Sequence, residues 1–101
     1  RSLVGSEMCI RDRNVFLLIE KSENRKPLTD AAIELVELSL HDKGCVAYDF
    51  FSSITRDNVM MICETWRTRE DLEAHMASEH FKRLVPRLQE LSTMTLEEFT
   101  F

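Results

Sequence analysis

The 101-residue chain has few cysteines, and their spacing excludes two kinds of stabilised fold. Cys9, Cys45 and Cys63 form an odd set without a C-x-x-C pair. This pattern argues against a disulfide framework and against a thiolate zinc site, and it fits a reducing compartment. We therefore expect a cytoplasmic protein.

Clustered positive charge, long apolar runs and cofactor motifs are also missing. The 13 basic residues are scattered among 18 acidic ones, for a formal charge of −5, which offers no footprint for nucleic acid or an anionic membrane. The longest apolar run, residues 15–19, is far too short to span a bilayer. There is no G-x-G-x-x-G, P-loop or H-E-x-x-H pattern. We expect no nucleic-acid partner, no membrane partner and no cofactor or metal.

The first thirteen residues differ from the rest of the chain. They show neither strand alternation nor a helical stripe, and they lack the continuous apolar segment of a signal peptide. Residues 1–13 resemble translated sequencing-adapter sequence. We expect them to be a non-native or disordered extension, so that Cys9 has no role. Residues 14–101 are then a single domain, with a native start near Asn14.

The remaining residues predict four strands and three helices. Expected strands cover residues 15–19, 46–54, 59–66 and 93–101, and the second carries Val46, Tyr48, Phe50 and Ile54 on one face. A first helix is expected over residues 28–41, ended near Gly44, and a second begins after Thr68, which has capping-box spacing. The third helix carries a clean apolar stripe from Phe81 to Leu91, and Pro86 inside it is expected to kink or split it.

The predicted order is β-α-β-β-α(α)-β, which is a ferredoxin-like α+β arrangement with helices on one side of an antiparallel sheet. The strands at residues 15–19 and 59–66 are apolar on both faces, however. An uncovered second face would leave a large apolar patch in water. We therefore expect a homodimer packed through the open sheet faces, forming a dimeric α+β barrel.

Two stretches of the chain resemble the antibiotic biosynthesis monooxygenase (ABM) family. One is Gly-Cys-Val-Ala-Tyr-Asp at residues 44–49, and the other is residues 59–81, an apolar strand, Glu-x-Trp, then Leu-x-Ala-His-x-x-Ser-x-His-Phe. The resemblance covers residues 14–101. It implies a ferredoxin-like homodimer with a pocket between sheet and helices. Similar members include cofactor-independent quinol monooxygenases, and relatives include heme-degrading enzymes, an isomerase and proteins without an assigned activity.

The resemblance is weakest toward the heme-degrading members. These place a Trp where this chain has His75 and a His where it has Val85. Both departures argue against heme breakdown.

Three residues are candidates for the chemistry. His75 falls on the apolar side of the second helix, where it is either a proton acceptor at a pocket wall or a structural imidazole bonded to a carbonyl or to Glu64. His80 lies near the start of the third helix, whose dipole disfavours a positive charge there; it is either a neutral acceptor or an exposed residue. Glu64 is a carboxylate among apolar neighbours, and it is either a site residue or a partner for a nearby arginine or histidine. His41 is expected to be solvated.

Five further residues are candidates for the pocket wall: Trp66, Tyr48, Phe81, Leu72 and Phe50. Trp66 either stacks on an aromatic substrate or wedges the helix against the sheet, and the wedge is the favoured interpretation. Core packing is the more natural role for Phe50. Cys45 and Cys63 have no base at motif spacing and are expected to be small buried residues.

The leading hypothesis is a cofactor-free monooxygenase acting on a small quinol or phenolic aromatic with O2. The resemblance implies that a base removes a hydroxyl proton and that the substrate anion itself reduces oxygen. His75 is expected to be the base or anchor, supported by His80 and Glu64. Two alternatives stay open: an isomerase or tautomerase using the same histidine without oxygen, and a non-catalytic dimeric module that binds a small ligand or acts in a stress response.

Overall fold

The computed structural model describes residues 11–100, so the expectation for Cys9 falls outside it. Its strands are β1 (Arg11–Leu18), β2 (Cys45–Ser52), β3 (Val59–Trp66) and β4 (Thr93–Thr100). Its helices are a 3-10 turn η2 (Ser22–Asn24), α1 (Arg25–Ser39), α2 (Arg69–Met76) and α3 (Glu79–Leu91). The strands form one sheet in the order β2-β3-β1-β4, and all neighbours are antiparallel. The expected ferredoxin-like α+β fold is confirmed.

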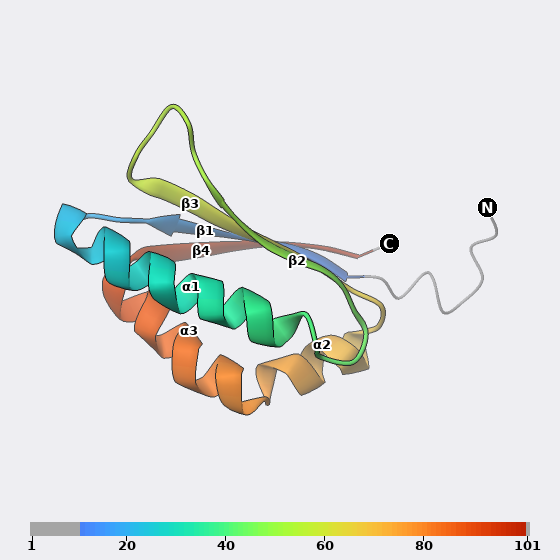
Figure 1. Cartoon of the computed structure of the whole chain (residues 1–101). Coiled ribbons are helices and arrows are strands. Elements are labelled where there is room, and N and C mark those ends of the chain that lie inside the picture. The colour runs from blue at the N-terminus through green and yellow to red at the C-terminus, as the bar shows by residue number, and fades with distance from the viewer. Residues whose placement is uncertain (1–10, 101) are drawn as a thin grey trace.

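The helices lie on one face of the sheet. Figure 1 shows α1 and α3 side by side against the sheet, with α2 beyond their ends near the close of β3. Between the two layers lies a core of aliphatic side chains, in which Leu17, Leu28 and Leu88 have no exposed surface. Periodic apolar residues on both layers drive this packing, because each buried Leu is worth about 1.5–3 kcal/mol of transfer free energy.

Local signals set most of the element boundaries. Strand β3 spans the expected residues 59–66, and the Thr68 hydroxyl accepts a hydrogen bond from the Asp71 backbone N–H (3.1 Å) at the start of α2. Ser78 begins α3 in the same way, accepting from the Phe81 N–H at 3.3 Å. Gly44 has φ +78°, a left-handed conformation that favours glycine, and it follows the end of α1.

Three details differ from the expectations. The third helix is not split: Pro86 lies inside the continuous α3, exposed like Lys82, whose carbonyl loses its partner where water can replace it. A register shift between Cys45 and Ala47 turns Val46 outward, 53% exposed, and Ile54 lies beyond the end of β2, fully exposed. The bulge breaks the period-two alternation at Val46, and Ile54 lies outside the strand, so neither shares the buried face of Tyr48.

The first strand begins earlier than residue 15. Arg11, Asp12 and Arg13 continue β1 and pair with Trp66, Thr65 and Glu64 of β3. The segment expected to be an extension therefore includes three residues that take part in the sheet. Among the described residues, no helix is long and apolar enough to cross a membrane.

The face of the sheet opposite the helices is partly apolar. Phe51, Met61 and Phe16 stand opposite one another on β2, β3 and β1, so their side chains form a row across this face. Phe51 is 47% exposed, and Phe16 and Met61 are half-buried. This row is the apolar surface on which the expectation of a dimer rests.

Candidate functional site

A cavity of about 230 Å³ lies between the sheet and helices α1 and α3. Its wall is mainly aliphatic, and its polar side chains are Arg13, Tyr48, Glu64, Gln89 and Thr95. Tyr48, Glu64 and Arg13 are cross-strand neighbours on β2, β3 and β1, so the sheet register sets them in one row. The remaining wall is formed by Val15, Leu35, Ile62, Phe81, Val85, Leu88, Met94 and Leu96.

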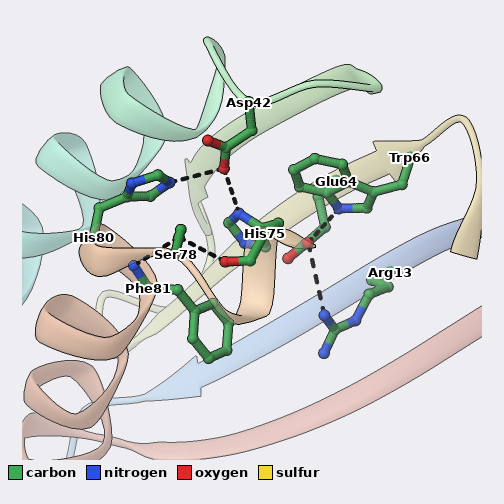
Figure 2. Close-up of polar contacts among 8 residues, drawn as sticks. All are labelled: Arg13, Asp42, Glu64, Trp66, His75, Ser78, His80 and Phe81. Atoms are coloured by element: carbon green, nitrogen blue, oxygen red, sulfur yellow. Dashed lines mark hydrogen bonds and ion pairs between the residues drawn. The ribbon is translucent and has the colours of Figure 1, made fainter. Parts of the chain in front are cut away.

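Glu64 is the buried carboxylate of this wall. It is 4% exposed, and its Oε1 accepts a hydrogen bond from the Trp66 indole Nε1 at 2.7 Å and lies 3.8 Å from the Arg13 guanidinium (Figure 2). Burial raises the pKa of Glu64, because the charged form loses hydration, while the indole and Arg13 act in the opposite direction. The carboxyl group is thus held at a point where protonation is easier than in water.

His75 lies directly behind the cavity wall. It is 1% exposed, and its ring packs on Trp66 (4.5 Å between ring centroids), Phe81 (5.2 Å) and Tyr48 (5.5 Å). Tyr48 and Phe81 also line the cavity, whereas His75 does not. Burial lowers the pKa of His75, although its hydrogen bond to Asp42 acts the other way, so the neutral ring is favoured.

Asp42 joins the two histidines. Its Oδ2 lies 2.8 Å from His75 Nδ1 and 2.8 Å from His80 Nε2, and Figure 2 shows both rings turned toward this one carboxylate. Ser78 holds the two helices together below it, because its hydroxyl donates to the His75 carbonyl at 2.6 Å and accepts from the Phe81 N–H. His80 is partly exposed at the start of α3 and lies outside the cavity lining.

The same three side chains are the candidate metal ligands among residues 11–100. One ligand atom each from Asp42, His75 and His80 lies within 4.8 Å of the others. Imidazole nitrogen and carboxylate oxygen suit Zn²⁺ and similar ions. The expectation of no metal came from missing motifs, and such motifs do not register two histidines five residues apart that α2 and α3 bring to one point.

Only some of the residues that were expected to line the pocket do so. Tyr48 and Phe81 are on the cavity wall together with Glu64. Trp66 and Leu72 are buried in the core and Phe50 packs against it, and none of the three reaches the cavity. Trp66 instead donates to Glu64 and packs on His75, so its indole supports the site from behind the wall.

The structure also gives a role or an environment to five residues outside the predicted site. Asp42 was missed, because a single aspartate in a loop carries no periodic signal. Arg13 was set aside with residues 1–13. His41 is exposed, as expected. Cys45 and Cys63 are half-buried free thiols with raised pKa values, to about 11 for Cys45, mainly through burial, and this makes them poor nucleophiles.

A solved structure and two curated proteins are similar to this chain. A conserved protein of unknown function from Bacteroides thetaiotaomicron, described as a possible oxidoreductase, is 45% identical with a TM-score of 0.89, covering 93% of this chain and 99% of its own. "Putative monooxygenase YcnE" from Bacillus subtilis is 27% identical over 76% of this chain and 81% of its own length. The uncharacterized protein sll1783 from Synechocystis is also 27% identical over 70% of this chain, which spans only about half (48%) of that protein.

The family model named Antibiotic biosynthesis monooxygenase matches residues 19–87. These residues include β2, β3, α2, Glu64, the Asp42–His75–His80 cluster and Phe81. With the fold, the chain belongs to the antibiotic biosynthesis monooxygenase family.

Proposed function

We propose that the chain is a cofactor-independent monooxygenase whose substrate is a small aromatic with a free hydroxyl group, such as a quinol or phenol. The observation that carries this proposal is the His75 Nε2 atom, which is buried and has no hydrogen-bond partner among residues 11–100. A buried acceptor left unpaired costs about 1–3 kcal/mol, and such groups are often functional. Family membership and the name of the Bacillus relative support the reaction class.

The cavity suits a small planar substrate. Its volume of about 230 Å³ lies below the roughly 300–1,000 Å³ of sites for drug-sized ligands, which favours a molecule of one or two rings. Aliphatic side chains cover most of the wall, and Tyr48 and Phe81 offer aromatic surfaces. Glu64 and Tyr48 provide polar groups that would orient a hydroxyl.

In the proposed reaction, His75 Nε2 accepts the hydroxyl proton after the Phe81 side chain turns aside. The resulting anion donates electrons from a ring carbon to O2, and a carbon–oxygen bond forms. The O–O bond then breaks as the ring carbon loses its hydrogen: one oxygen stays as a carbonyl, and the other leaves as water with the two substrate hydrogens. The substrate supplies all four electrons, so the balance needs no further reductant.

The test is oxygen consumption with a panel of reduced naphthoquinones and phenols, together with ¹⁸O2 incorporation to separate oxygenation from simple quinol oxidation. We expect activity in the wild type and its loss in His75→Ala. His41→Ala is the matched control, because this exposed histidine lies outside the site, and it should keep full activity. No oxygen uptake by the wild type across the panel would overturn the proposal.

A second candidate function is a non-catalytic ligand-binding module. It is favoured by the observation that both imidazoles already bond to Asp42 and that neither lines the cavity. Saturable binding of an aromatic without turnover in air would support it. Turnover without oxygen would instead indicate an isomerase or tautomerase.

We also propose a homodimer in the cytoplasm, formed through the open face of the sheet. The row of Phe51, Met61 and Phe16 would be buried there, because contiguous apolar side chains exposed to water are unfavourable. Sedimentation velocity at micromolar concentration would give a dimer, and a monomer would contradict this part of the proposal.

A further inference from the structure

The loop that carries Asp42 is tightly held. The Asp42 N–H donates to the Ser39 carbonyl at 3.0 Å, and its carbonyl accepts from the Cys45 N–H at 3.1 Å. Gly44 follows with φ +78°, and its carbonyl accepts from the Arg67 N–H at 2.8 Å. The loop is therefore fixed both to the end of α1 and to the segment after β3, so the position of the Asp42 carboxylate is determined by the fold.

The position of Asp42 determines which nitrogen of His75 carries the proton. An ionised carboxylate only accepts hydrogen bonds, so each nitrogen 2.8 Å from Oδ2 must bear hydrogen. The His75 ring is buried, and its Nε2 atom has no hydrogen-bond partner among residues 11–100, so a second proton there would be buried and unpaired; the ring therefore holds a single proton. That proton lies on Nδ1, and Nε2 on the other side of the ring is left with a bare lone pair.

We propose that Asp42 is a positioning residue: it locks His75 in the Nδ1–H tautomer and leaves Nε2 free to accept the proton of a substrate hydroxyl. This rests on the proposed function for the substrate, whereas the tautomer itself does not. The free Nε2 belongs to a ring enclosed by Trp66, Phe81 and Tyr48, and the last two separate it from the cavity. Without the Asp42 carboxylate, neither nitrogen of the His75 ring would be the preferred site of the proton.

His80 has the supporting role. It donates to the same Oδ2 atom from the first turn of α3, so the carboxylate is held between two helices. Asp42 keeps 19% of its side-chain surface exposed and would otherwise be able to turn toward water. Two donors at one oxygen restrict that movement.

A metal ion at these three residues would require the opposite tautomer. A metal bound to His75 takes the Nδ1 lone pair, so the proton moves to Nε2, and metal-bound histidines usually donate that proton to a neighbouring acceptor. Within the described part of the chain, the buried Nε2 atom has no such acceptor within hydrogen-bonding distance. The structure therefore favours the hydrogen-bonded cluster over a metal site.

The test is the ¹⁵N chemical shift of both His75 nitrogens in the full chain at pH 7.5, measured with EDTA and again with Zn²⁺. The His75 resonances are assigned with His75→Asn. We expect a protonated Nδ1 and an unprotonated Nε2, unchanged by Zn²⁺. In Asp42→Ala, which removes the acceptor, the proton should move partly or wholly to Nε2.

Kinetics with an accepted quinol provide a second readout. Asp42→Asn should lower kcat by about 10²-fold with little change in KM, the usual scale for lost acid–base catalysis, and Asp42→Glu should restore part of it. Asp30→Asn is the control, since Asp30 is exposed on α1 and, within residues 11–100, its ion pair is with Lys26 alone.

The two proposals fail separately. A wild-type His75 with its proton on Nε2, or a tautomer that Asp42→Ala does not change, would overturn the positioning role whether or not quinols are turned over. A shift of the proton on adding Zn²⁺ would overturn it in favour of a metal site. The expected tautomer in a protein without oxygenase activity would support the positioning of His75 and refute only the proposed reaction.

Discussion

The hydrogen bond from Trp66 should stabilise the buried Glu64 carboxylate, and the free energy of this coupling can be measured. The indole Nε1 lies 2.7 Å from Glu64 Oε1, and both residues are buried. A hydrogen bond to a charged group contributes about 1.5–3 kcal/mol. Trp66→Phe removes this donor, but it also leaves a gap where the indole packed, so the single variant mixes two effects.

A double-mutant cycle separates the two effects. Glu64→Met removes the acceptor at similar volume, and in this background Trp66→Phe should cost only its packing energy. The loss of the ion pair with Arg13 is common to both proteins that carry Glu64→Met and cancels. We expect a coupling free energy of about 1.5–3 kcal/mol at pH 8.

The assay is urea unfolding followed by far-UV circular dichroism, which does not depend on the tryptophan. Protein concentration must be the same for all four variants, because a dimer makes apparent stability concentration-dependent. Additivity at independent sites holds within about 0.3–0.5 kcal/mol. A coupling inside that margin would refute the view that the indole stabilises the buried charge.

The contribution of Glu64 to stability should also depend on pH. Burial raises the pKa of Glu64 in the folded chain, so the folded state binds this proton more tightly than the unfolded one. Its stabilising contribution is therefore complete below the unfolded pKa of about 4.3 and is lost as pH rises through the folded value. Relative to the wild type, Glu64→Met should accordingly gain stability as pH increases.

Three further predictions concern the loop, the open face and the buried imidazole. Gly44→Ala should lower the free energy of unfolding by at least about 1–2 kcal/mol in urea titrations, because φ is +78° and a Cβ would overlap the Asp71 carboxylate; an unchanged midpoint would contradict this. Phe51→Glu should convert the proposed dimer to a monomer in sedimentation velocity, whereas Ile54→Glu in the exposed hairpin loop should not, and equal effects would argue against this interface. Because burial lowers the pKa of His75, the protein should lose stability as pH falls below about 6.5, and His75→Phe should flatten the curve between pH 7 and 5; parallel curves would count against it.

Much of the fold follows from local sequence patterns. The short apolar run that begins at Val59 predicted β3, Thr68 predicted the start of α2, and the stripe ending at Leu91 predicted α3. Such patterns are reliable because burial on one face imposes a period on adjacent residues. They failed at Val46, where a bulge interrupts the period, and the split considered at Pro86 does not occur, because an exposed position tolerates the missing hydrogen bond.

The candidate site is only partly visible in the sequence. The Glu-x-Trp pair and the two histidines after it could be read directly, since they lie on neighbouring elements. The contacts of Asp42 with His75 and His80 span 33 and 38 residues, and nothing local to a loop aspartate indicates them. Likewise, only the packing of α3 against the sheet determined that Tyr48 and Phe81 line the cavity while Trp66 lies behind it.

By itself, the sequence determined the elements, their order, the apolar faces and the resemblance to the family, because each of these depends on residues close together in the chain. The tertiary structure alone decided which polar atoms meet. Hydrogen-bond partners are selected by the packing of whole elements, which brings the loop after α1 against the ends of α2 and α3. For this reason His75 could be identified as a candidate from the sequence, whereas its bond to Asp42 and its free Nε2 could not.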